Sequence, residues 1–390
     1  MLTPKHAHSA FFAASLVFLF LFIFWLFYIL PASPKMLGRD FLSYYIGANI
    51  VKNGEIRRIY DLPTQLSYQN ALSGVVASKV LPYRALVVSS FIYMPFTFMS
   101  LISAYKYFIL FQFISVAICV YCLVKDLGTK PLPLILLLMH PVLWINYYQG
   151  QPSLLLLLFL LLSVSQFRKG KRLFAGILLS LVLLKPQFFP LVIFMNILAS
   201  DRRFLIGSLL SGFFLFFFNL FLYGLDFIKD YIVFLQLTET PYYGSHLGAS
   251  FSIKSVVELV GVLFRKDFSV LFIPINTIIV CVVGIMLFLN KERIKGFGEK
   301  LGLCILLSIP LGMHLLNHDL VLLILPVCVF VADINLERQG VFFWTVYFIT
   351  SIYFIINFAV LIDTSVVGLV PLLVFLYFYV RKYYISNKTS

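Results

Sequence analysis

The sequence predicts an all-α polytopic membrane protein, and three observations on the 390-residue chain support this fold class. Its residues are 61% hydrophobic and 12% charged, whereas a soluble domain is about 45–50% apolar and about 25% charged. The mean hydropathy is +0.99. The apolar residues also run in blocks, such as 154–162, instead of alternating as they do in the strands of a membrane β-barrel. These observations exclude a soluble enzyme, a secreted disulfide scaffold, a disordered chain and a β-barrel.

About twelve apolar segments are expected to form transmembrane helices, because roughly 20 apolar residues cross a bilayer. The first of them is longer than the about 7–15 apolar residues of a cleaved signal and has no A-x-A site, so we expect it to be retained. The predicted spans are 10–31, 102–124, 131–145, 153–167, 173–184, 187–199, 204–223, 269–289, 301–313, 319–333, 341–361 and 365–380.

Several of these segments are shorter than the roughly 17 residues that cross a bilayer unaided. Polar residues interrupt two pairs of them, at Lys185-Pro186 and between His314 and Asp319. Broken helices at membrane depth are tolerated where they line a protein cavity or water. The interruptions therefore predict a functional site.

Short clusters of Lys and Arg between the spans predict the orientation of the chain, because cytoplasmic loops carry an excess of these residues. Both termini are expected in the cytoplasm. Two longer segments, residues 32–84 and 224–268, are then expected on the outer face of a plasma membrane, with the bacterial inner membrane as the expected location. The whole chain, residues 1–390, is expected to be one membrane domain. The clusters are Lys125/Lys130, 168–172, 202–203, 291–295 and 381–382.

The outer segments are expected to contain helices of their own. Residues 43–53 have apolar residues at helical spacing, which predicts an interfacial amphipathic helix. Residues 86–100 are apolar but cut by Pro95, which predicts a re-entrant or surface-lying helix pair. The segment 32–84 carries seven Lys and Arg against three Asp and Glu, a surplus that attracts anionic lipid headgroups.

The net charge of +14 would indicate nucleic acid in a soluble protein. Here the cations lie between hydrophobic blocks, so membrane lipids are the expected partners and nucleic acid is not. The five cysteines lie in apolar runs and are expected to be small core residues. Cys119 and Cys122 have C-x-x-C spacing, but no strand precedes them and no second pair follows, so neither a redox nor a zinc role is expected.

Ionisable side chains beside apolar spans are the informative residues, because each is costly unless it is paired or solvated. Asp40 stands just before the predicted helix 43–53. It is either an N-terminal cap or a carboxylate held at the membrane surface as a general base. Arg39 beside it would keep Asp40 ionised or contact a phosphate.

Two further candidates come from the interrupted spans. Lys185 has no carboxylate near it in the sequence, and its ammonium either snorkels to the interface or meets an anionic headgroup or phosphate. His314, His318 and Asp319 could hold a metal ion, but their spacing is weak for that purpose. Hydrogen bonds to a polar ligand or its phosphate are favoured.

The segment 147–153, Tyr-Tyr-Gln-Gly-Gln-Pro-Ser, is expected to cap the outer end of a helical hairpin. Its Gln and Tyr side chains suit sugar hydroxyls, although Gly-Gln-Pro is also ordinary turn chemistry. Four polar groups are thus predicted on the same membrane face: Asp40 with Arg39, Lys185, the group from His314 to Asp319, and the segment 147–153.

These motifs, in their order and separation, resemble those of glycosyltransferase family 87. Its members are polytopic mannosyltransferases of the GT-C architecture that use a polyprenyl-phosphate sugar as donor. Ser153 stands where many relatives have Asn, in a position for sugar contact. The resembling motifs, within residues 35–335, are Asp40-Phe41-x-x-Tyr44-Tyr45, Ile59-Tyr60-Asp61, Gly150-Gln151-x-Ser153, Arg172-x-x-Ala175-Gly176, Leu184-Lys185-Pro186 and His318-Asp319-Leu320 leading to Leu325-Pro326.

The resemblance implies a GT-C-like bundle whose outer loops and re-entrant helices cover a cavity at the outer membrane surface. It implies inverting transfer of a sugar, expected to be mannose, from polyprenyl phosphate to a lipid or glycan acceptor, with Asp40 as the catalytic base. Neither a nucleotide nor a metal is expected, because the chain has no Gly-rich phosphate loop and no DxD motif. The substrate-binding candidates are Arg39, Tyr44, Tyr45, Gln151, Lys185, Gln187, His314, His318 and Asp319.

Two other classes remain open. A lipid or glycolipid transporter or flippase predicts paired half-sequences with corresponding broken helices, and the two halves of this chain do not resemble each other. A non-catalytic assembly or binding subunit predicts that Asp40, Lys185 and His318 lie far apart. The convergence of these three residues in one outer-facing cavity would distinguish the enzyme from the binding subunit.

Overall fold

The computed structural model describes residues 39–129, 134, 138, 140–243, 251–264, 269–312, 315–332 and 365–385, and this part of the chain is helical. The predicted spans 10–31 and 341–361 lie outside the described residues. In the first half of the chain the helices are α2 (Arg39–Lys52), η3 (Ile56–Arg58), α3 (Leu62–Ser73), η4 (Val87–Ile92), η5 (Met94–Phe98), α4 (Leu101–Leu127), α6 (Pro141–Gln149), α7 (Ser153–Arg168), α8 (Arg172–Ser180), η6 (Leu181–Leu184), η7 (Pro186–Phe188) and α9 (Phe189–Ala199). In the second half they are α10 (Arg202–Tyr223), α11 (Phe227–Thr238), η8 (Pro241–Tyr243), α12 (Ile253–Phe264), α13 (Ser269–Leu289), α14 (Phe297–Leu311), η10 (Asn317–Leu323), α15 (Ile324–Ala332), α17 (Ser365–Val380) and the π-helix η11 (Arg381–Ile385).

Three described helices, α4, α10 and α13, are long and apolar enough to cross a membrane. The number rises to four if α6 and α7, which are bent by 119° at their junction, count as one broken span. Shorter apolar helices of 10–17 residues cover 172–184, 186–199 and 317–331. The predicted class, an all-α membrane protein, is therefore confirmed. The predicted number of about twelve spans is not confirmed, because the polar interruptions divide several apolar segments into short pieces.

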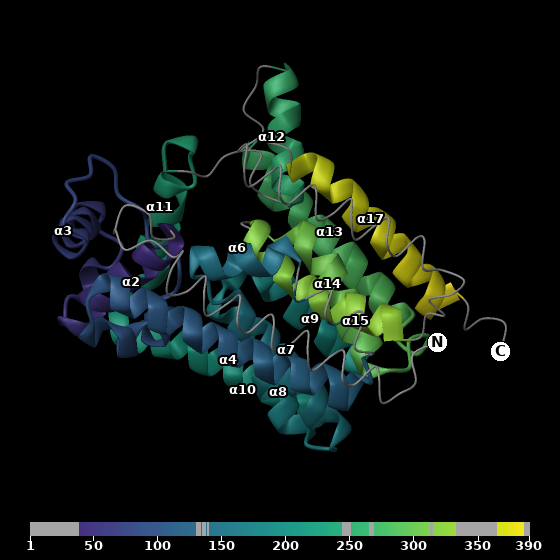
Figure 1. Ribbon diagram of the computed structural model, residues 1–390. Helices are drawn as coiled ribbons and strands as arrows, with labels where there is room; N and C mark the ends of the chain where they lie inside the picture. Colours follow the sequence, from purple (N-terminus) through teal and green to yellow (C-terminus); the bar gives the residue numbers. More distant parts are fainter. Residues whose placement is uncertain are drawn as a thin grey trace.

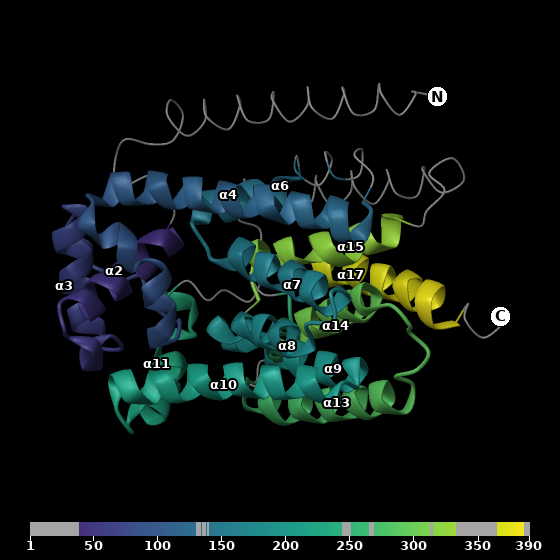
Figure 2. The same ribbon diagram turned by 90° about the horizontal axis from the view of Figure 1, so that it is seen from below.

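Helices α4, α7, α8 and α10 pack in that order, so that α7 and α8 lie between the long helices α4 and α10 (Figure 2). Different parts of the chain lie at the two ends of these helices (Figures 1 and 2). Helices α2, α3 and α11 lie together at one end, here called the α2 end. The other end, here called the basic end, contains the loops 168–172 and 200–203 and the start of α14. There Arg172 lies 3.8 Å from Asp201, and the rings of Phe167 and Phe297 stack with centroids 3.7 Å apart.

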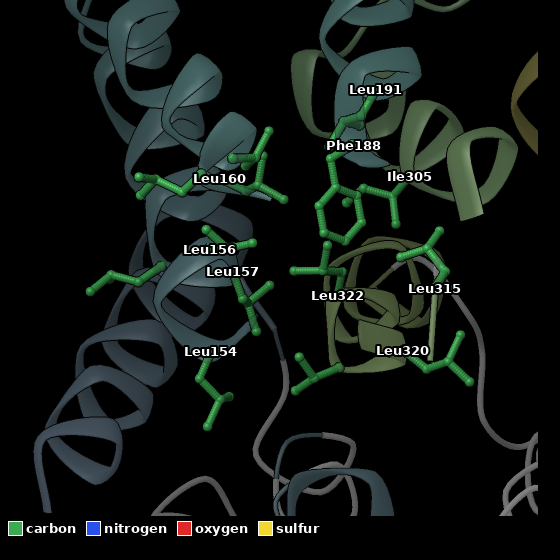
Figure 3. Packing of buried hydrophobic residues seen from close by; sticks show 14 of the residues in the cluster. Leu154, Leu156, Leu157, Leu160, Phe188, Leu191, Ile305, Leu315, Leu320 and Leu322 are labelled. Atoms are coloured by element: carbon green, nitrogen blue, oxygen red, sulfur yellow. The ribbon is translucent and has the colours of Figure 1, made fainter. Parts of the chain in front are cut away.

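The core between the two ends is built from large aliphatic side chains. Figure 3 shows leucines of α7 on one side of this packing, and side chains of η7, α9, α14 and η10 on the other. In a membrane such close packing is itself a main source of helix association, since lipid tails are as apolar as leucine. The labelled residues are Leu154, Leu156, Leu157, Leu160, Phe188, Leu191, Ile305, Leu315, Leu320 and Leu322.

Helices α8 and α10 make an unusually close backbone contact. A Cβ atom at Gly207 would lie 1.9 Å from the carbonyl oxygen of Leu173, and one at Gly176 would lie 2.0 Å from that of Phe204. Small residues allow helices to approach in this way. The contact positions α8 against the long helix α10. It thereby also positions the interruption of the helix at Lys185, directly after η6.

The prediction of an interfacial helix at residues 43–53 is wrong in part, as the position of α2 shows. The predicted helix at 43–53 exists, but it begins at Arg39 and its residues 41–51 are all buried, so it is an internal helix and not an interfacial amphipathic one. Segments distant in the sequence cover its polar and small residues. Tyr83 packs its ring where a Cβ of Gly47 would stand, and Ser43 donates to the carbonyl of Pro82 at 3.1 Å.

The two long segments predicted on the outer face pack against each other at the α2 end. The ring of Tyr60, just after η3, lies 5.2 Å from that of Tyr231 in α11. Arg84 donates to the carbonyl oxygens of Thr238 at 2.5 Å and Tyr243 at 3.0 Å. Residues 86–100 form the short helices η4 and η5 on either side of Tyr93. This packing surrounds α2 and holds its first turn in place.

Candidate active site

Asp40 lies in the first turn of α2, where the helix dipole favours a carboxylate. Its side chain is 33% exposed, and its Oδ2 atom lies 3.7 Å from Nδ1 of His318. His318 is buried in the first turn of η10. The fold therefore joins a carboxylate near the start of the described chain to an imidazole near its end.

The imidazole of His318 lies between two carboxylates. Its Nε2 atom lies 3.5 Å from Oδ2 of Asp319, on the side opposite Asp40. Both His318 and Asp319 are buried, so Asp40 is the only one of the three that has substantial contact with solvent. Both ring nitrogens lie beside a carboxylate, and the carboxylate of Asp319 is the closer and the more deeply buried of the two, so it favours the proton at Nε2 and leaves Nδ1 as the acceptor. The arrangement can therefore hold a proton at Nε2 and accept one at Nδ1.

Asp319 also forms a buried ion pair with Lys185. The Lys185 Nζ atom lies 2.6 Å from Oδ1 of Asp319 and donates to Oγ of Ser153 at 3.0 Å. Ser153 donates to the same Oδ1 at 2.6 Å. The Lys185 side chain is 5% exposed, so it does not snorkel to the surface. Removing one partner of such a pair costs about 3–5 kcal/mol, because the other charge is left buried and unpaired.

These five side chains, Asp40, Ser153, Lys185, His318 and Asp319, are called the charged cluster below. Asp40, Lys185, His318 and Asp319 were candidates from the sequence, and the structure brings all four together at the α2 end. The pairing of Lys185 with Asp319 was not predicted, because the two residues are distant in the chain and no local spacing relates them.

A network of amides surrounds the cluster; its members Gln151 and Tyr44 were candidates from the sequence, whereas Asn146 and Gln112 were missed. Asn146 of α6 donates from Nδ2 to the backbone oxygen of His318 at 3.2 Å. Gln112 of α4 donates to Oδ1 of Asn146 at 3.4 Å and to the backbone oxygen of Gln151. Tyr44 donates to Oε1 of Gln151 at 3.3 Å. The sequence contained one indication of this network. Gln112 is a single amide in a predicted apolar span, and a polar group there needs a hydrogen-bond partner.

Gly150 allows the loop between α6 and α7 to approach α2. It ends α6 with φ of +66°, in the left-handed region that glycine tolerates. A Cβ atom here would lie 2.6 Å from Cβ of Phe41, the residue after Asp40. The Gly150 carbonyl accepts a hydrogen bond from Tyr93 at 2.9 Å. A larger residue would separate the start of α7 from the first turn of α2.

Burial shifts the pKa of two polar groups outside the cluster that interact electrostatically with Asp40. It raises the pKa of the Tyr44 phenol well above its usual range, with smaller contributions from Tyr83 and Asp40, so Tyr44 stays a neutral donor. Burial lowers the pKa of the Arg84 guanidinium, and the carboxylates of Glu239 and Asp40 oppose that effect. Arg84 remains charged and adds positive potential at Asp40.

The remaining candidates are Tyr45, Gln187, Arg39 and His314. Tyr45 donates its hydroxyl to the carbonyl of Met99 at 2.6 Å, before the start of α4. Gln187 lies in η7 and is partly buried. The side chain of Arg39 and the whole of His314 lie outside the described residues. In the part of the chain that is described, no three His, Cys, Asp or Glu side chains are grouped as ligands of a metal ion. The expectation that the protein needs neither metal nor nucleotide stays a prediction.

Residues 87–309 match the sequence model of glycosyltransferase family 87, over more than half of the 390-residue chain. The chain belongs to glycosyltransferase family 87. The family predicted from the motifs is thereby confirmed, and the protein is a membrane glycosyltransferase. No curated protein and no solved structure gives a significant match to the chain.

The family 87 match covers only part of the site. Gln151, Ser153 and Lys185 lie within the matched residues, whereas Asp40 and His318 lie outside them. Membership of the family favours the enzyme over the transporter and the binding subunit. The short distances within the charged cluster favour the enzyme as well, because a binding subunit would leave Asp40, Lys185 and His318 far apart.

Proposed function

We propose that this glycosyltransferase moves a sugar, with mannose as the first candidate, from polyprenyl phosphate to a lipid or glycan acceptor at the outer face of the membrane. The observation that carries the proposal is the position of Asp40. It is a partly exposed carboxylate, 3.7 Å from a buried imidazole, in a membrane protein of a glycosyltransferase family.

In the proposed reaction Asp40 is the general base. The acceptor hydroxyl gives its proton to the Asp40 carboxylate while the hydroxyl oxygen forms a bond to the anomeric carbon. The bond between that carbon and the phosphate oxygen breaks, and its electron pair leaves with polyprenyl phosphate. A single displacement of this kind inverts the anomeric centre and forms no covalent enzyme intermediate.

His318 can accept the proton that Asp40 takes from the acceptor. With its Nε2 proton directed at Asp319, its Nδ1 lone pair faces Oδ2 of Asp40 and accepts the proton from that carboxyl. The resulting imidazolium is stabilised by two carboxylates. Asp40 returns to its ionised form, and before the next acceptor binds the proton on His318 passes back through Asp40, the partly exposed member of the group, to solvent.

The leaving phosphate is a weak base, so its departure needs positive charge more than a proton donor. Arg84 supplies positive potential beside Asp40, and Arg39 is the further candidate from the sequence. The donor is already activated by its phosphate, so the proposed reaction requires neither a nucleotide nor a metal. The lipid tail would enter laterally between apolar helices.

The positive-inside rule supports an outward-facing site. The clusters of Lys and Arg at 168–172 and 202–203 lie at the basic end, and the charged cluster lies at the opposite, α2 end (Figure 2). Cytoplasmic loops carry the excess of cations. The α2 end would then face away from the cytoplasm, in the plasma membrane.

The test is sugar transfer by the purified protein in lipid nanodiscs. Mannose and other hexoses are offered as polyprenyl phosphates and, in parallel, as nucleotide sugars, with membrane glycolipids as acceptors. We expect a product from the lipid-linked donors, with inverted anomeric configuration by NMR and the mass of one added hexose. Transfer from nucleotide sugars alone would overturn the donor class.

Replacing Asp40 tests the base itself. Asp40→Asn keeps the size of the side chain but cannot take the proton, so we expect transfer to fall at least about 100-fold. Expression and membrane insertion should be unchanged, because Asp40 is partly exposed. Turnover close to that of the unmodified protein would remove Asp40 from this role.

A further inference from the structure

Lys185 lies at a break between two helical segments, and the surrounding residues stabilise this break. It separates η6 from η7 in an extended conformation, with φ −114° and ψ 101°, because Pro186 disfavours a helical residue before it. Ser89 donates to the carbonyl of Leu184 at 2.8 Å, which satisfies an oxygen that the break leaves without a helical partner. The break directs the ammonium into the protein, toward the first residue of α7.

The two oxygens of the Asp319 carboxylate have different partners. Oδ1 receives the Lys185 ammonium at 2.6 Å and the Ser153 hydroxyl at 2.6 Å, and these two groups are themselves 3.0 Å apart. Oδ2 lies 3.5 Å from Nε2 of His318 and 3.4 Å from the backbone nitrogen of Leu316. Lys185 and Ser153 therefore fix the carboxylate by one oxygen and leave the other to the imidazole.

We propose that Lys185 is a positioning residue that acts through Asp319, and not a ligand of the donor phosphate. By pairing with Oδ1 it keeps Asp319 ionised and oriented, so that Oδ2 holds the His318 proton at Nε2 and the Nδ1 lone pair faces Asp40. Ser153 also donates to Oδ1 and so helps to orient the Asp319 carboxylate. This inference rests on the proposed function, because it concerns the proton that Asp40 collects.

The burial of the pair argues against a phosphate contact. The Lys185 side chain is 5% exposed and that of Asp319 is 1% exposed, whereas Asp40 is 33% exposed. A phosphate that bound Lys185 would have to displace a carboxylate already 2.6 Å away and leave its charge buried without a partner. The donor meets the cluster from the Asp40 side, where the ammonium is not accessible.

A double-mutant cycle tests the inference. Lys185→Met, Asp319→Asn and the double variant are compared with the unmodified protein by steady-state kinetics with the lipid-linked donor. Each single variant should lower kcat about 100-fold, with the donor KM within about twofold. The double variant should be no slower than the singles, because both changes remove the same function. Multiplied losses of kcat, or a tenfold rise of the donor KM caused by Lys185→Met in both backgrounds, would overturn the inference.

A spectroscopic readout separates this inference from the proposed function. With ¹⁵N-labelled histidine, assigned by comparison with His318→Gln, neutral His318 should carry its proton at Nε2. Lys185→Met and Asp319→Asn should both lose that preference. An unchanged tautomer in Lys185→Met would refute the positioning role. This measurement needs no sugar transfer, so it decides the inference even if the unmodified protein transfers nothing.

Two further variants keep the test decisive. Ser153→Ala retains the charges of Lys185 and Asp319 and should fold even where Lys185→Met does not. We expect kcat to fall about tenfold with unchanged donor KM. Neutral His318 should then be a mixture of the Nδ1-protonated and Nε2-protonated tautomers. Unaltered kcat and tautomer in Ser153→Ala would contradict the inference. Lys300→Met is the control for loss of a half-buried lysine elsewhere in the protein. Lys300 donates to the carbonyl of Leu198 at 2.8 Å near the basic end, and its loss should change kcat less than twofold.

Discussion

At the scale of single residues, neighbouring side chains on α2 have separate tasks. Tyr44 and Tyr45 follow each other in the chain, yet the first donates to Gln151 beside the charged cluster and the second to Met99 away from it. Successive residues of a helix point about 100° apart. The motif Asp40-Phe41-x-x-Tyr44-Tyr45 thus combines residues of the site with residues that hold the helix in place.

This separation yields a matched pair of variants. Tyr44→Phe keeps the ring stacked on Tyr93, with centroids 4.6 Å apart, but leaves Oε1 of Gln151 without its donor. We expect kcat/KM to fall about 5–10-fold, as the loss of a hydrogen bond of about 1–1.5 kcal/mol implies. Tyr45→Phe loses a comparable bond and should keep kcat/KM within twofold. Equal activity losses in the two variants would contradict the separation.

At the scale of elements, the contact between α8 and α10 positions the break that carries Lys185. Gly176 and Gly207 let the two backbones touch, and the hydroxyls of Ser180 and Ser208 are hydrogen-bonded at 2.6 Å. A shift of α8 along α10 would move η6, and with it the ammonium, relative to Asp319. The site therefore depends on glycines that are distant from the reacting groups.

Two alanine substitutions on α10 test this dependence. Gly207→Ala places a Cβ atom 1.9 Å from a carbonyl oxygen, and such overpacking costs about 1–3 kcal/mol. We expect a lower midpoint of thermal unfolding in detergent and reduced sugar transfer. Gly212→Ala is the control, because its Cβ would lie 3.7 Å from the nearest side chain and alanine favours the helix by roughly 0.5–1 kcal/mol. An unfolding midpoint for Gly207→Ala at or above that of Gly212→Ala would refute the close contact.

At the scale of the whole molecule, the charged cluster and the short cationic loops 168–172 and 200–203 lie at opposite ends of the helices. The α2 end contains the charged cluster, and the basic end contains the cationic loops (Figure 1). This polarity is what the proposed outward orientation requires.

Cysteine labelling measures the orientation directly. Val76 lies after α3 at the α2 end and is 92% exposed, and Lys169 is exposed in the loop after α7. In a Cys281→Ser background, which removes an exposed thiol, a membrane-impermeant maleimide should label Val76→Cys in intact cells. It should label Lys169→Cys only after permeabilisation. The reverse pattern would place the site in the cytoplasm.

The parts of the fold that the sequence predicted are those that depend on local composition. The spans at 102–124, 204–223 and 269–289 correspond to α4, α10 and α13 within a few residues, because each is a long and predominantly apolar run. The burial of α2 was missed because its covering residues, such as Tyr83, come from later in the chain. Local periodicity does not contain that information.

The same distinction applies to the site. Asp40, Lys185 and His318 were recognisable one by one, because an ionisable group beside an apolar span is costly. The pairing between them was not, since Lys185 and Asp319 lie in two different interrupted segments with no common spacing. Asn146 was not among the candidates, and its bond to the His318 backbone became visible only in three dimensions.

The distance in sequence between Asp40 and His318 has a consequence for biogenesis. Translation delivers residue 40 early and residue 318 late, after the long helices α4, α10 and α13 have emerged from the ribosome. A nascent chain that stops before η10 contains α4, α10 and α13 but lacks His318, the partner of Asp40. Catalytic competence would then arise in one late step of insertion, and incomplete chains would remain inert toward the activated sugar around them.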